Sequence, residues 1–331
     1  MTRSLLLLIA ALALALALIA SLHLGLRLYG PGEVLAALAD HGEGTDAVII
    51  RSLRLPRTLI AVVAGAGFAL SGLMIQIVTR NPLAEPGLIG INAGAGLAVA
   101  LGISAFGSIG LPQIGLLAFT GALATTGLVF SVTATSGGLT RNDTTLLAGV
   151  TIAALLTSLT QVILLLDETA LETLLFWLSG GFADRDLGLL GIGLPALILG
   201  YAACAALAQS LDALRLNDQT AEALGVSVSR VRVASLVTAA GLAAGAVAMS
   251  GPIIFLGLIA PHLARRLIGD AAPTLRLALF TCMIGGLIAV LADIVARLIV
   301  APGEAPVGSV LALVGVPILI GLLRRKRALA R

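Results

Sequence analysis

The chain has 331 residues, of which 59% are hydrophobic and only 11% are charged, and its mean hydropathy is +1.10. In a soluble globular domain roughly half of the residues are apolar and about a quarter are charged, so this composition excludes that class. The formal net charge of +3 gives no reason to propose nucleic acid as a partner. We therefore expect a protein that crosses a membrane several times.

A transmembrane helix needs about 20 predominantly apolar residues. The apolar runs of this chain are continuous and rich in Leu, Ala, Gly and Val, without the strict alternation of a membrane β-barrel, so we expect an all-α fold. About ten stretches of suitable length form one membrane domain over residues 1–331. The expected spans are 5–28, 58–79, 88–107, 113–136, 144–166, 188–208, 231–250, 253–268, 275–299 and 307–323.

Basic residues set the expected orientation, because loops rich in arginine and lysine stay in the cytoplasm. With the amino terminus inside, most of the arginines and the only lysine, Lys326, fall on the inner side. We therefore expect an inner-membrane protein with both termini in the cytoplasm. The first apolar run continues to about Leu28 without a clear cleavage site, which favours an uncleaved first span over a signal peptide.

Two segments, 29–57 and 167–187, are expected outside. The first becomes basic in RSLRLPR, residues 51–57, on the side where basic residues are usually scarce. Those arginines either anchor the second span at the membrane interface or bind an acidic partner outside the membrane. The second segment is typical of a short amphipathic helix that ends at Gly180, with Trp177 at the interface.

A polar island at 211–232 separates two blocks of apolar sequence. Its charges would each cost a few kcal/mol in hydrocarbon, so it lies at a water-facing surface, which the charge count places in the cytoplasm. Asn217 or Asp218 can cap a short helix, Gly225 suits its left-handed end, and Ser227 can cap a second helix that runs into the next span.

Two stretches rich in proline and glycine, 79–96 and 249–269, predict broken helices at membrane depth, covered by protein or lining a cavity. Ser71-Gly72 and Ser250-Gly251 are each followed later in the chain by Gly-Leu-Ile, which indicates an internal repeat of opposite orientation.

Several polar side chains fall inside expected spans. Thr157, Thr160 and Gln161 project from one helical face and either line a water-filled path or form interhelical hydrogen bonds. Asp293 and Arg297 lie four residues apart and can pair, or Arg297 can face outward.

Catalytic chemistry within this chain is not expected. The only lysine is outside any P-loop pattern, so ATP cannot be bound by that route, and neither a nucleophile set nor a metal cluster stands out. Cys204 and Cys282 lie in expected spans as packing residues.

Three stretches together resemble the permease subunits of the ABC importers for iron-siderophores, haem and cobalamin. They are LRLPRTLIAVVAGAGFALSGLMIQIVTRNPLAEPGLIGINAGAG at 53–96, GPIIFLGLIAPHLARRLIG at 251–269, and LADIVARLIVAPGEAPVGSVLALVGVP at 291–317. LLAGV at 146–150 and FWLSGGF at 176–182 extend the similarity to nearly the whole chain from residue 30 onward.

The resemblance implies a ten-span subunit that pairs with a second copy or a paralogue around a central pathway, surrounded by membrane lipid, with spans 2–5 and 7–10 as inverted repeats. A separate ATP-binding cassette subunit would bind ATP and magnesium, and a periplasmic binding protein would deliver the substrate. The implied contacts with the ATPase are Asn217, Asp218, Ala221, Glu222, Leu224 and Gly225. The implied docking residues for the binding protein are Arg54, Arg57 and Arg297; the cytoplasmic gate is Asn142, Asp143 and Thr144; the pathway face includes Thr157, Thr160 and Gln161.

The expected function is thus the passage of an iron-siderophore chelate across the membrane. Cobalamin or haem is the alternative substrate within the same mechanism. A secondary transporter, with Asp293 carrying the coupling proton, and a receptor-like protein without transport are the competing classes.

Overall fold

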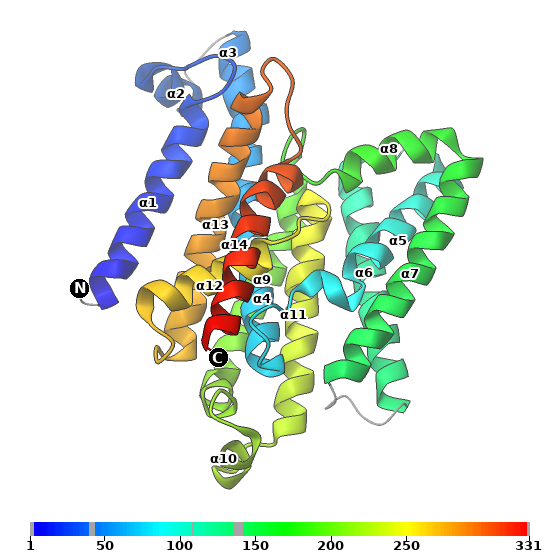
Figure 1. Ribbon diagram of the computed structural model, residues 1–331. Coiled ribbons are helices and arrows are strands. Elements are labelled where there is room, and N and C mark those ends of the chain that lie inside the picture. Colours follow the sequence, from blue (N-terminus) through cyan, green and yellow to red (C-terminus); the bar gives the residue numbers. More distant parts are fainter. Residues whose placement is uncertain (1–2, 40–43, 108, 136–141, 330–331) are drawn as a thin grey trace.

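The computed structural model describes residues 3–39, 44–107, 109–135 and 142–329, and within these ranges every regular element is a helix (Figure 1). The first half contains α1 (Arg3–His23), α2 (Pro31–Leu38), α3 (Thr45–Val48), η1 (Ile49–Arg54), α4 (Leu55–Thr79), η2 (Pro86–Ile89), α5 (Ile91–Phe106), α6 (Leu111–Thr135), α7 (Asn142–Leu166) and α8 (Glu168–Leu178). The second half contains η3 (Leu187–Leu189), α9 (Leu190–Leu214), α10 (Asp218–Ala223), α11 (Val228–Ser250), α12 (Leu256–Ile268), α13 (Thr274–Ile299) and α14 (Val307–Leu329).

The all-α prediction is confirmed, and a helix lies at each expected span. Seven helical segments in the described part are long and apolar enough to cross a membrane. Helices α5 and α12 are shorter, with 16 and 13 residues, because the proline- and glycine-rich breaks take up the preceding sequence. The count of about ten spans and the inverted repeat therefore stay predictions.

The helix that carries the second span begins earlier than the sequence predicted. The prediction started that span at residue 58, whereas α3, η1 and α4 form one helical run over Thr45–Thr79. Pro56 lies in the first turn of α4, where its missing amide hydrogen is tolerated, and η1 before it is a π-helical turn. The arginines of RSLRLPR consequently belong to a helix and not to a loop.

Helices α4, α11 and α13 form the centre of the bundle, and glycines bring their backbones together (Figure 1). A Cβ atom on Gly65 of α4 would overlap the Gly285 carbonyl oxygen of α13, and one on Gly72 would overlap Gly257 of α12. Helices surrounded by lipid gain little from the hydrophobic effect when they associate, so van der Waals contact between closely approaching backbones holds them together. Helix α4 is accordingly buried along most of its length.

The two broken segments pack against each other inside the protein. Irregular backbone at membrane depth is tolerated only where protein covers it or where it lines a water-filled cavity. The Gln76 side-chain amide donates to the carbonyl oxygens of Ala84 and Gly257, both at 3.4 Å. Glu85 accepts a hydrogen bond of 3.2 Å from the backbone N–H of Phe255, the left-handed residue (φ 68°) that precedes α12.

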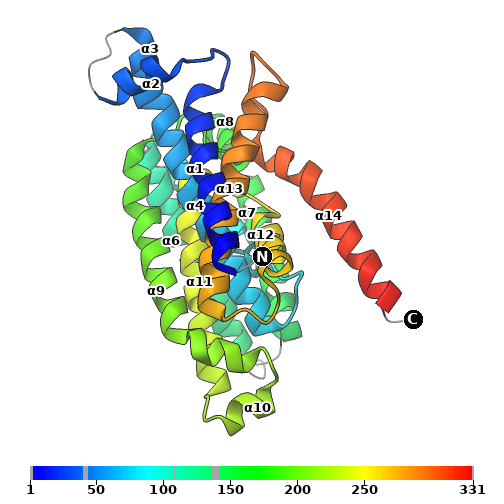
Figure 2. The same cartoon turned by 90° about the vertical axis from the view of Figure 1, so that its left-hand side faces the viewer.

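Helix α10 projects beyond one end of the bundle, and α2 and α3 lie at the opposite end (Figures 1 and 2). We call these the α10 end and the α2 end. Figure 2 also shows α14 leaning away from the other helices. Val307, Val310 and Leu311 in its first turns are buried, whereas Leu313 and Val314 further along are 72% and 54% exposed.

Candidate functional site

The polar island forms a short helix with the ends that its sequence predicted. The Asn217 side chain caps α10 by accepting from the Thr220 N–H at 2.6 Å, and Gly225 adopts φ 81° just after the helix. Ser227 precedes α11, although its side chain makes no capping bond. The island therefore contains one separate helix, α10, followed directly by the long helix α11.

Exposure divides the six residues predicted to contact an ATPase. Leu224 is 66% exposed, and Asn217 and Glu222 are also exposed. Ala221, in contrast, is completely buried in the cluster of apolar side chains beneath α10. Ala221 therefore holds α10 on the bundle, and Leu224 lies at its surface.

Asp218 ties α10 to α4 and α11. One of its carboxylate oxygens accepts from Arg80 Nη2 at 2.5 Å, and Arg232 Nη2 binds both oxygens at 2.9 and 3.0 Å. Arg80, which ends α4 in a left-handed conformation, also donates to the Leu214 carbonyl at the end of α9. We call Arg80, Asp218 and Arg232 the Asp218 cluster.

The start of α13 is attached to the same region. Asp212, near the end of α9, accepts from the Thr274 backbone N–H at 2.9 Å and from its hydroxyl at 2.6 Å, and Arg215 donates to the Ala272 carbonyl at 2.7 Å. A carboxylate at a helix amino terminus also interacts favourably with the helix dipole. Displacement of α10 would therefore also shift the adjoining ends of α4, α9, α11 and α13.

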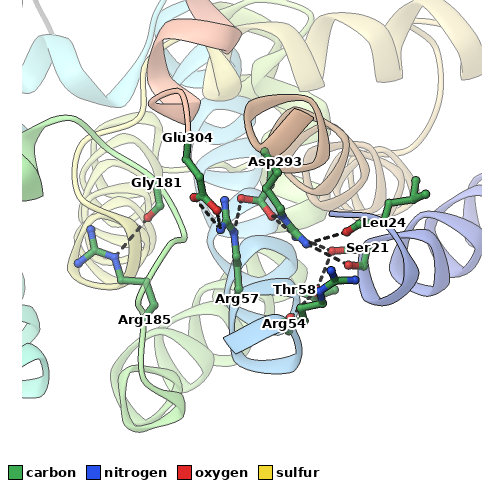
Figure 3. A network of polar contacts seen from close by, with 10 residues as sticks. Ser21, Leu24, Arg54, Arg57, Thr58, Gly181, Arg185, Asp293 and Glu304 are labelled. Atoms are coloured by element: carbon green, nitrogen blue, oxygen red, sulfur yellow. Dashed lines mark hydrogen bonds and ion pairs between the residues drawn. The ribbon is translucent and has the colours of Figure 1, made fainter. Parts of the chain in front are cut away.

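A second charged cluster lies at the α2 end (Figure 3). Arg57 of α4 donates from Nε to Asp293 at 2.7 Å and from Nη1 to both oxygens of Glu304 at 2.7 and 2.8 Å. Arg297 binds the other Asp293 oxygen through Nε at 3.0 Å, which confirms the predicted pairing four residues apart. We call Arg57, Asp293, Arg297 and Glu304 the Asp293 cluster.

The Asp293 cluster also holds α1. Arg297 donates to the Ser21 carbonyl at 3.0 Å and to its hydroxyl at 2.8 Å. Nearby, Arg54 donates to the carbonyls of Leu22 and Arg27 and stacks on the Tyr29 ring at 4.4 Å. These bonds join α1 to α4 and α13 at the α2 end.

The three arginines predicted to dock a binding protein are thus buried in this structure. Arg54, Arg57 and Arg297 are 7%, 8% and 4% exposed, and each has partners within the chain. Docking at these guanidinium groups requires their release from those partners. Asp293 is completely buried between two guanidinium groups.

The predicted gate and pathway residues lie on α7. The helix begins at Asn142, but the side chains of Asn142, Asp143 and Thr144 lie outside the part that the structure describes. Thr157 and Gln161 are exposed, whereas Thr160 is buried and donates to the Leu156 carbonyl of its own helix.

No group of three histidine, cysteine or acidic side chains that could hold a metal occurs among the described residues, and both cysteines are free thiols. The residues that sequence reasoning did not assign to a site are Arg80, Arg232, Glu304 and Arg185. One signal in the sequence could have identified these residues. Each charge lies beside an apolar helix, where an unpaired charge is costly, so each would be expected to have a partner.

The bundle of long apolar helices is that of a multi-pass membrane protein, and comparisons with known proteins identify the family. The model of the FecCD transport family matches residues 12–325. This chain belongs to that family.

Named relatives agree with the match. The ferric enterobactin transport system permease protein FepD of Escherichia coli (strain K12) is 38% identical over 320 residues, which cover 95% of this chain and 93% of the relative. The Fe(3+) dicitrate transport system permease protein FecC of the same organism is 35% identical over 302 residues, 90% and 89% of the two chains. A solved inward-facing structure assigned to a metal-chelate type ABC transporter superposes with a TM-score of 0.83 at 30% identity, covering 97% of this chain and 98% of that one.

Proposed function

We propose that this chain is the membrane-spanning permease subunit of an ATP-driven importer for a ferric chelate of the siderophore or citrate type. The relatives named above transport ferric enterobactin and ferric dicitrate, and the similarity extends over nearly the whole of each chain. Haem and cobalamin, and an ion-coupled secondary mechanism, are not favoured by these relatives.

The observation that carries the coupling part of the proposal is the attachment of α10. Helix α10 is exposed and projects from the bundle, and Asp218 bonds it to α4 and α11. A partner that binds and moves α10 would therefore also move α4 and α11. The partner is a separate ATP-binding cassette subunit, which binds ATP and magnesium. When the ATPase subunit binds ATP and closes, it would move α10. The bundle would then alternate between an outward-facing and an inward-facing state.

In this proposal the α10 end lies in the cytoplasm together with both termini, and the α2 end faces the periplasm. The positive-inside rule supports this orientation, since Arg80, Arg215, Arg230, Arg232 and the basic carboxyl terminus all lie on the α10 side of the expected spans.

A second copy of the chain, or a paralogue, completes the pathway. Helix α14 leans away from its own bundle, and α7 presents Leu147 and Leu155 at 70% and 58% exposure. We place the pathway between the two subunits, where Thr157 and Gln161 are exposed on α7 and the gate residues Asn142, Asp143 and Thr144 begin that helix.

A periplasmic binding protein docks at the α2 end. The Glu304 side chain is 38% exposed although it binds the buried Arg57. We propose that an acidic side chain of the binding protein displaces Glu304 and so reaches Arg57, with Arg54 and Arg297 becoming accessible in the same movement.

Co-purification tests the proposal at Leu224. Leu224→Asp places a charge on the exposed face of α10 without entering the core, whereas a large residue at Ala221 would disrupt packing. Leu28→Asp is the matched control. It is the same substitution at a leucine that is 69% exposed and lies toward the α2 end, away from α10.

We expect the ATPase subunit to co-purify with the wild-type chain and the control, and its recovery with Leu224→Asp to fall about tenfold, as for an interface hot spot. Uptake of the radiolabelled ferric chelate should fall in parallel. A wild-type chain that transports the chelate on an ion gradient without any ATPase subunit would refute the proposal.

A further inference from the structure

A cavity of about 330 Å³ lies at the α2 end, and the Arg57–Glu304 ion pair of the Asp293 cluster forms part of its wall. The rest of the wall is the loop that follows α8, which includes Asp184 and Arg185, the segment before α14, and the side chain of Phe176. The volume is at the lower end of the range for small-molecule sites.

Two arginines and two carboxylates line this cavity; Glu304 pairs with Arg57, whereas Arg185 makes no ion pair among the described residues. It is only 6% exposed, and its hydrogen bond is from Nε to the Gly181 carbonyl at 3.3 Å. No carboxylate among the described residues lies within ion-pair distance of its guanidinium group, although Asp184 is near enough to affect it electrostatically. Burial lowers the pKa of Arg185 to about 10, so the group remains charged at neutral pH.

The neighbouring arginines differ from Arg185 in this respect. Arg57 has Asp293 and Glu304 as counter-charges, and Arg297 has Asp293. Figure 3 shows Arg185 apart from that network, with its bond to Gly181. A buried charge without a partner costs several kcal/mol, so its retention in a cavity points to an anionic ligand.

The loop that positions Arg185 is fixed by its backbone. Gly181 N–H donates to the Ser250 carbonyl at 2.9 Å. Gly180 adopts φ 66°, and a Cβ atom there would overlap the Pro252 carbonyl oxygen. The backbone that carries Arg185 is therefore held in place before a ligand arrives, which reduces the entropy lost on binding.

We propose that this cavity is a carboxylate-binding site at the periplasmic mouth of the permease, in which the Arg185 guanidinium group pairs with an acidic group of an arriving ligand. A planar guanidinium group can bind both oxygens of a carboxylate at once. The assignment rests on the proposed function for its orientation, and the carboxylate belongs either to the transported chelate or to an acidic side chain of the binding protein.

The only tryptophan of the chain reports on the site. Trp177 immediately follows Phe176, which lines the cavity, and is itself buried. The purified full chain in detergent is titrated with potassium citrate, a tricarboxylate probe, at constant ionic strength, and Trp177 fluorescence is recorded. We expect a saturable change for the wild type.

Two substitutions at Arg185 test the role of its charge and shape. Citrate should bind about tenfold or more weakly to Arg185→Gln, and Arg185→Lys should be intermediate because an ammonium group is a point charge without the planar fork. An unchanged citrate affinity in Arg185→Gln, or a wild-type response that follows ionic strength alone, would overturn the assignment.

A second pair of variants serves if Arg185→Gln fails to fold. Ala305 lines the cavity and is partly exposed, so Ala305→Glu introduces a carboxylate that competes with citrate, and Ala305→Gln has the same size without the charge. Loss of the citrate response in Ala305→Glu together with its retention in Ala305→Gln supports the site. An equal response in the two variants contradicts it.

The assembled importer distinguishes the source of the carboxylate. If the chelate supplies it, Arg185→Gln raises the KM for ferric citrate uptake about tenfold and leaves the Kd of the binding protein unchanged; if the binding protein supplies it, that Kd rises. Citrate binding to the permease alone requires no ATPase, so failure of the proposed function in co-purification and failure of this site are separate results.

Discussion

The two charged clusters at opposite ends of the bundle differ in how far water reaches them. In the Asp293 cluster the side chains of Asp293, Arg297 and Arg57 are 0%, 5% and 9% exposed. In the Asp218 cluster Asp218 and Arg80 are 38% and 39% exposed, and Arg232 is 11% exposed. Both clusters join helices far apart in sequence, but only in the first is the shared carboxylate completely buried.

This difference predicts that the two ends of α4 differ in how easily their contacts rearrange. The helix contributes Arg57 to one cluster and Arg80 to the other. A buried ion network is costly to break, because any charge left alone stays desolvated. A partly exposed pair is weak and can exchange its partners for water. We infer that the α2 end keeps its packing until a binding protein supplies replacement charges, while the α10 end can rearrange without such help, as expected where an ATPase acts.

The largest effect should come from Asp293→Asn. The change leaves Arg57 and Arg297 buried without their shared counter-charge, and we expect it to lower the free energy of unfolding by about 3–5 kcal/mol. Unfolding in mixed detergent and dodecyl sulfate micelles, followed by circular dichroism, measures the change.

The double variant Asp293→Asn with Arg297→Gln is the control, because it removes one of the two stranded charges. We expect it to be more stable than Asp293→Asn alone. Strictly additive losses would show that the two residues do not act as a buried pair.

Glu304→Gln should have a smaller effect within the same cluster. Glu304 accepts two hydrogen bonds from Arg57, but its side chain is 38% exposed, so water can replace much of what is lost. We expect a loss of about 0–1 kcal/mol in the same unfolding assay. A loss as large as that of Asp293→Asn would mean that the cluster is buried throughout.

Much of the fold followed from the sequence because its signals are local. Apolar runs located the helices, and Asn217 and Gly225 located the ends of α10, since capping depends on residues only a few positions apart. The pairing of Asp293 with Arg297 was also predictable from helical spacing.

The clusters themselves could not be predicted, because their contacts are distant in sequence. Arg57 and Asp293 are 236 positions apart, and Arg80 and Asp218 are 138 apart. A single sequence contains nothing that pairs such charges. For the same reason the arginines 54, 57 and 297 could be predicted as a group at one end, but not as buried side chains.

The smallest predicted effect concerns Asp218→Asn and its dependence on salt. Coulomb attraction between partly exposed charges is screened over about 8 Å at physiological ionic strength, so added salt should loosen α10 in the wild type. Hydrogen exchange of the α10 amides, measured at low and high sodium chloride, should therefore become faster with salt.

In Asp218→Asn we expect exchange to be faster at low salt already and to change little when salt is added, because the charge that the salt screens is gone. Asn217 still caps the helix in that variant, so α10 itself should persist. Amides of α13 near Asp293 provide the internal comparison, since burial shields that cluster from ions. Equal salt sensitivity at the two ends would contradict the division between a fixed end and an adjustable one.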